Sequence, residues 1–175
     1  YSSIYYILIM MVDYKLFPGP LAYRHFFLHD AVDMVNALDK VGLWNLTENT
    51  LRHFDYKEGD NYLDGLGGNI FALFEHYRIT KDKRFLERVY PKIIEKCKLI
   101  KRLRAKQIRP DLRNTPFYGL LPQSVSQDNF TIPAYLYVDN WWALIGLKSG
   151  MKAAQILNNR LDFLWLKDEY EKLHK

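Results

Sequence analysis

Residues 137–144 read Tyr137-Val138-Asp139-Asn140-Trp141-Trp142-Ala143-Leu144, and they mark the point where a long loop gives way to a helix. The apolar spacing predicts that this helix runs from Asp139 to about Leu157, where Asn158-Asn159 breaks it. The preceding loop, about residues 107–138, contains Tyr118-Gly119-Leu120-Leu121-Pro122. Loops of this length inside a compact domain are usually functional or disordered, and the aromatic, apolar content argues against disorder. We therefore expect a loop that delivers one carboxylate and several aromatic rings to a helix start.

Two earlier stretches follow the same plan. His29-Asp30 opens a predicted helix that Gly42 ends, and Asp64-Gly65 lies in a glycine-rich lead into a predicted helix at residues 69–78. Each of the three acidic helix starts follows a long loop, whereas the helices between them are joined by short connections. This alternation predicts helical hairpins with Asp30, Asp64 and Asp139 gathered at one end of the assembly.

The remaining helices are predicted from apolar periodicity and from helix breakers. They cover residues 4–14, 43–56, 83–106 and 161–174, with a polar turn at 57–61 and with Pro91 expected to split or kink the third of these helices. No stretch alternates with period two, so the sequence predicts one all-α domain over residues 1–175. The pattern Gly65-Leu66-Gly67-Gly68 is explained by close approach of packed helices. It does not fit a phosphate loop, because no strand is predicted before it and no Lys-Ser/Thr follows it.

Composition limits the classes of partner and cofactor. The net charge is +5, with much of the basic excess between Lys81 and Arg113, which we interpret as a solvated helix face instead of a nucleic-acid surface. The single cysteine, Cys97, excludes an internal disulfide and is predicted to be a small core residue, so the chain fits a reducing, cytoplasmic compartment. Residues 4–12 are apolar but too few to span a bilayer, so no membrane partner is expected. The five scattered histidines form no metal motif, and we expect no metal and no cofactor.

The three carboxylates have two possible roles. Each can simply cap its helix, accepting backbone N–H bonds and interacting with the helix dipole. Alternatively, three on one rim beside aromatic rings can form a carbohydrate site, because sugar hydrolysis needs an acid with a raised pKa and a second carboxylate. Apolar neighbours would raise the pKa of Asp139, whereas the helix N-terminus would lower it.

A family resemblance runs through these stretches in order. It is carried by residues 27–31, by Asp64-Gly65 with residues 72–82, by residues 118–122 and by residues 137–147. Together they resemble the six-hairpin, (α/α)6-barrel glycosidases, the group that contains glucoamylase-like and trehalase-like enzymes. The resemblance covers about residues 1–158. It implies part of an (α/α)6 toroid and a glycoside hydrolase acting on an oligosaccharide or glucoside by carboxylate acid/base catalysis.

The resemblance also implies roles for individual residues. His29-Asp30 matches an Arg-Asp pair that grips sugar hydroxyls, with His29 replacing the usual arginine and so removing its forked clamp. Asp139 matches the position near which these enzymes keep their acid. The other expected substrate-binding residues are Asp64, Tyr137, Asn140, Trp141 and Trp142.

A complete toroid of this family has twelve helices, and this chain is predicted to supply about seven. We therefore expect an N-terminal or partial portion, with the general base in a later hairpin beyond Lys175. Apolar faces at residues 4–12 and 161–166 predict a homodimer or a missing partner half that covers them. The alternative is a non-catalytic helical-hairpin module that binds a protein or a glycan.

Overall fold

The computed structural model describes residues 2–55, 62–126 and 130–175, and the predicted polar turn at 57–61 lies outside them. Its described residues form seven α-helices, which confirms the all-α prediction. Their bounds are α1 Ser2–Ile9, α2 Leu28–Lys40, α3 Trp44–Leu51, α4 Asp64–Thr80, α5 Lys83–Ala105, α6 Tyr137–Ile156 and α7 Arg160–His174, with a short 3-10 turn at Pro110–Leu112. No helix of the described part is long and apolar enough to cross a membrane.

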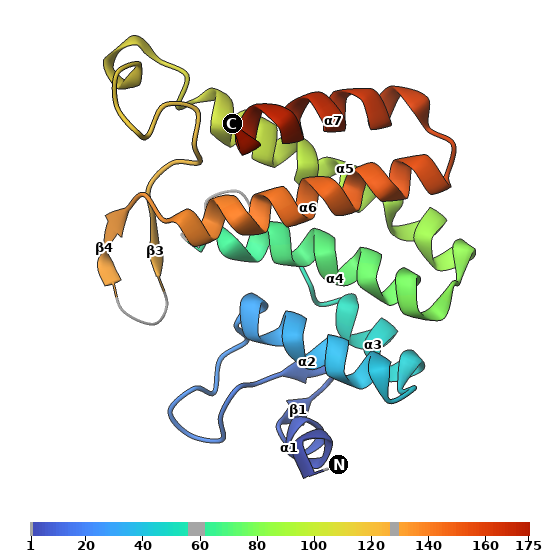
Figure 1. Cartoon of the computed structure of the whole chain (residues 1–175). Coiled ribbons are helices and arrows are strands. Elements are labelled where there is room, and N and C mark those ends of the chain that lie inside the picture. The colour runs from blue at the N-terminus through green and yellow to red at the C-terminus, as the bar shows by residue number, and fades with distance from the viewer. Residues whose placement is uncertain (1, 56–61, 127–129) are drawn as a thin grey trace.

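Six of the helices form three consecutive hairpins, α2/α3, α4/α5 and α6/α7 (Figure 1). Helix α4 packs between α2 and α6, and its contact with α6 is the most extensive of the fold. The helices α2, α4 and α6 begin on the same side of the molecule, on the left in Figure 1. The hairpin prediction is therefore confirmed, whereas closure into a toroid stays a prediction.

Two small antiparallel ladders were not predicted. Strands β1 (Met11–Val12) and β2 (Lys15–Leu16) follow α1, which ends at Ile9 and not at residue 14. The two turn residues, Asp13 and Tyr14, both have positive φ, at 48° and 62°, as a tight primed hairpin turn requires. Strands β3 (Ser124–Ser126) and β4 (Phe130–Ala134) lie in the loop before α6. Such short ladders leave no alternating pattern long enough to detect in a sequence.

Helix α5 continues through Pro91, so of the two expected effects the split is not found, and the kink stays a prediction. A proline inside a helix leaves the carbonyl four residues earlier without its usual N–H donor. Both Pro91 and Glu87 are exposed, so water can reach this carbonyl. Asp82 caps the helix, accepting hydrogen bonds from the backbone N–H groups of Arg84 and Phe85.

The glycines near the start of α4 allow it to touch α6, as the sequence predicted. They lie inside α4, which begins five residues earlier than the predicted helix. A Cβ on Gly67 would lie 2.0 Å from the carbonyl oxygen of Trp142, and a Cβ on Gly146 would lie 3.0 Å from the Cα of Gly67. The two backbones are therefore in direct contact, which no residue with a side chain at position 67 allows.

The apolar ends of the chain are exposed only in part. In α1, Tyr5, Tyr6 and Ile9 are mostly exposed, as is Leu161 at the start of α7. Leu166 is instead fully buried in the core, where α7 packs against α6. Association through the exposed residues stays a prediction.

The glycine contact yields a first prediction. Replacing Gly67 by Ala places a methyl group inside the van der Waals radius of a backbone carbonyl, which cannot move without separating the helices. We expect the free energy of unfolding, measured by urea denaturation, to fall by about 2 kcal/mol or more. The matched control is Gly65→Ala, whose new methyl would meet only the side chain of Leu28, at 3.2 Å. Equal losses in the two variants would contradict the packing argument.

Candidate functional site

None of the three acids occupies the N-cap position of its helix. The N-cap positions of α2, α4 and α6 are held by Phe27, Leu63 and Leu136, and none of these helices has a side-chain capping bond. The carboxylates of Asp30, Asp64 and Asp139 lie instead within the first helical turn. The three acids therefore do not occupy N-cap positions, although Asp64 accepts a hydrogen bond from the backbone N–H of Gly65 in its own first turn.

The α4–α6 contact brings two of these carboxylates together. Gly67 follows Asp64 by one helical turn, and Trp142 follows Asp139 by one turn, so the point of backbone contact lies directly beside both acids. The two carboxylates are close enough to interact electrostatically, because the charge of Asp64 raises the pKa of Asp139.

His29 connects the third carboxylate to this pair. Its Nε2 lies 3.3 Å from Oδ2 of Asp30, and its Nδ1 lies 3.9 Å from Oδ2 of Asp64. The Nδ1 atom is shielded from solvent and has no hydrogen-bond partner, although the side chain as a whole is one quarter exposed. Asp64 is fixed by a 2.8 Å hydrogen bond from the backbone N–H of Gly65 to its Oδ1. Residues from α2, α4 and α6 thus form one acidic cluster: His29, Asp30, Asp64 and Asp139.

Asp139 is the most deeply placed acid of the cluster. Its residue is 2% exposed, and burial raises the pKa of its carboxyl from 3.8 to about 6. The Ser124 hydroxyl donates a hydrogen bond to Oδ2 and lowers this pKa, as does a hydrogen bond from the backbone of Asp64, while the charge of Asp64 raises it. Burial has the largest effect and outweighs these two hydrogen bonds, so the pKa of Asp139 lies above its ordinary value.

Asn140 holds the long loop against this carboxylate. The residue is buried, its Oδ1 accepts a 2.9 Å bond from the backbone N–H of Leu121, and its Nδ2 donates to the carbonyl of Leu136 at 2.9 Å. Because both polar atoms already have partners within the chain, Asn140 orders the loop that carries Ser124. No pattern along the chain indicates the Ser124–Asp139 contact, because Ser124 lies in a loop without regular periodicity.

The three aromatic residues expected at the site differ in exposure. Tyr137 and Trp141 are 64% and 63% exposed and lie one turn apart on α6. Trp142 is partly buried and packs edge-to-face on Phe71, with ring centroids 5.9 Å apart. Tyr137 and Trp141 therefore offer exposed rings on a face of α6 other than the buried one that carries Asp139, because two residues turn a helix by about 200°. Trp142 belongs to the α4–α6 packing.

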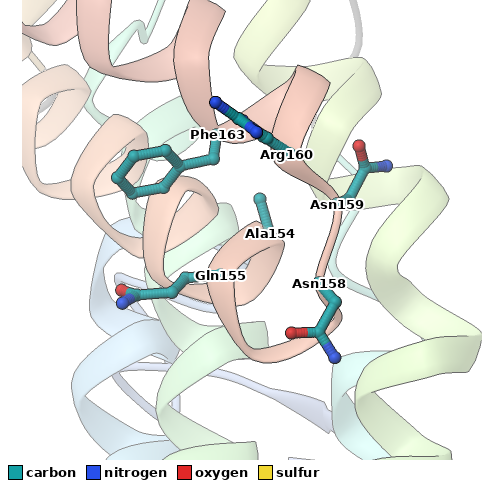
Figure 2. Close-up of a pocket in the computed structure, with 6 residues that line it drawn as sticks. All are labelled: Ala154, Gln155, Asn158, Asn159, Arg160 and Phe163. Carbon is teal, nitrogen blue, oxygen red and sulfur yellow. The ribbon is translucent and has the colours of Figure 1, made fainter.

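A cavity of about 260 Å³ lies at the other end of α6, at the turn into α7 (Figure 2). It is lined by Gln155, Asn158 and Arg160, among others. Along the axis of α6, Asp139 and Asn158 are separated by about 28 Å. This cavity is therefore separate from the acidic cluster.

No group of three or more His, Cys, Asp or Glu side chains in the described ranges is arranged to hold a metal ion. Comparison with protein-family models, curated proteins and solved structures gives no significant match. The glycosidase resemblance accordingly remains a prediction from the residues quoted above.

The burial of Asp139 predicts a pH-dependent effect on stability. The pKa of its carboxyl is higher in the folded chain, at about 6, than the ordinary 3.8, so the folded state loses stability as the pH rises from about 4 through 6. Asp139→Asn removes this charge while keeping an acceptor for Ser124. We expect the variant to gain on the order of 2 kcal/mol over the wild type at pH 7.5, and little at pH 4, by urea denaturation.

Asp168→Asn serves as the control, because Asp168 is exposed and Lys172 lowers the pKa of its carboxyl. Its removal should bring no gain at either pH. A loss of stability in Asp139→Asn at pH 7.5 would show that the carboxylate stabilises the fold.

Proposed function

We propose that this chain is a glycoside hydrolase domain, or a portion of one, that acts on an oligosaccharide or glucoside with Asp139 as general acid. The observation that carries the proposal is the pKa of Asp139, raised to about 6 in a cluster assembled from three helices. A general acid must keep its proton near the working pH, and an ordinary aspartate does not.

The residues near Asp139 would bind and orient the sugar. Asp30 and Asp64 would accept hydrogen bonds from sugar hydroxyls, and the ring of His29 lies between them, with an Nδ1 that has no hydrogen-bond partner. The exposed rings of Tyr137 and Trp141 lie on another face of α6 than Asp139, so they would stack on a sugar unit away from the reacting bond. Compared with an arginine, His29 offers no forked pair of donors, so we expect weaker gripping of the sugar.

The second candidate is a glycan-binding module without catalysis. It is favoured by the 2% exposure of Asp139, because a general acid must reach the glycosidic oxygen of its substrate. It uses the same exposed aromatic pair and the same hydroxyl-binding carboxylates. The two candidates differ in whether Asp139 transfers a proton.

The proposal predicts that the effect of Asp139→Asn depends on the leaving group. Alkyl glucosides need protonation of the departing oxygen, so their kcat/KM should fall by about 10²- to 10⁴-fold. Dinitrophenyl glucosides leave as stable phenolates, so their kcat/KM should change far less. Initial-rate measurements on both substrates with the same protein provide the comparison, and an equal loss on both would contradict an acid role.

Two further variants should move the pH profile in opposite directions. Ser124→Ala removes a hydrogen bond that favours the charged form of Asp139. The basic limb of the pH profile of kcat/KM, near pH 6 in the wild type, should therefore move to higher pH. Asp64→Asn removes a neighbouring charge that raises the pKa of Asp139, so this basic limb should move to lower pH.

A separate outcome would favour the second candidate. If the wild type hydrolyses no glycoside but an iminosugar raises its melting temperature, the chain is a glycan-binding module.

A further inference from the structure

A second cavity, of about 360 Å³, lies on the flank of the molecule where α3 and α5 cover α4. Its floor includes Leu51, Leu73 and Phe85, which are 2–3% exposed. The volume is within the usual range for small-molecule sites. Leu73 follows Asp64 by about 13 Å along α4, so this cavity is independent of the acidic cluster.

Two arginines at the rim share a single carboxylate. The guanidinium groups of Arg88 and Arg52 lie 2.7 Å and 3.5 Å from the same oxygen of Glu48, Oε1. More than half of each arginine side chain is exposed. Arg88 also lies over the ring of Phe85, with its Cζ 5.4 Å from the ring centroid. One carboxylate therefore balances two cations that remain accessible to another anion.

A third cation, Lys92, lines the same cavity and is partly buried. Its Nζ donates a hydrogen bond to the carbonyl oxygen of Phe54, and burial lowers the pKa of this amine. The nearby carboxylate of Asp55 lies 3.4 Å from Nζ of Lys96 and so already has a cationic partner. Three cationic side chains and one carboxylate thus give the lining a net charge of +2.

We propose that this cavity binds a small aromatic anion, a carboxylate or a phosphate ester. The aromatic body would lie on the floor beside Phe85, in place of water that the apolar side chains bind poorly. The anionic group would face Lys92 and the two arginines, which supply donors suited to carboxylate and phosphate oxygens. By contrast, the cavity at the α6–α7 turn has one cation, Arg160, in its lining.

The test is ligand-observed fluorine NMR with the whole chain and three probes of one shape. These are 4-(trifluoromethyl)benzoate, 4-(trifluoromethyl)phenyl phosphate and the neutral 4-(trifluoromethyl)benzamide. We expect at least one anion to bind at least fivefold more tightly than the amide, and the stronger of the two identifies the anionic group. Equal binding of all three probes, or no binding at millimolar concentration, would overturn the proposal.

Variants locate the site. Lys92→Gln should weaken anion binding at least fivefold. Arg52→Gln should weaken it as well, and it is a second test at an exposed position where the substitution does not threaten folding. Lys98→Gln on the exposed face of α5 removes the same charge outside the cavity and should leave the affinity unchanged. Equal weakening by Lys98→Gln would mean that the anion responds only to overall charge, which also overturns the proposal.

Discussion

The direct backbone contact between α4 and α6 is the constraint on which the rest of the structure depends. It requires glycine at position 67, since any Cβ there would overlap the carbonyl of Trp142. The contact lies one helical turn from Asp64 and one turn from Asp139, so the same approach that closes the core also sets the two carboxylates side by side. The closest packing of the fold and the interaction of Asp64 with Asp139 thus occur at the same place, between α4 and α6.

Placing two acids at such a contact costs stability. Burial and the charge of Asp64 both oppose ionisation of Asp139, and the hydrogen bond from Ser124 offsets this only in part. Proteins commonly keep such unfavourable arrangements where function needs them. The surrounding structure supports it locally, because Asn140 fixes the loop and Gly65 fixes Asp64.

Charged side chains of opposite sign gather at two places in the described structure. Three carboxylates lie together where α2, α4 and α6 begin. Three cationic side chains, Arg52, Arg88 and Lys92, line the flank cavity, where Glu48 balances only part of their charge. We therefore propose different ligands for the two places, neutral hydroxyl groups at the first and anions at the second.

The sequence by itself determined the helices, their pairing as hairpins, the acidic residues at three helix starts and the need for close approach at the glycines. These features depend on apolar periodicity, on helix-breaking residues and on residues a few positions apart, so they can be recognised in the sequence. Only the tertiary structure decided that apolar residues occupy the three N-cap positions, that Asn140 and Trp142 serve packing, and that His29 lies between Asp30 and Asp64. It likewise decided the contact of Ser124 with Asp139 and the pKa that results. These depend on which segments meet in space, and burial, which controls the balance at Asp139, exists only once the helices have packed.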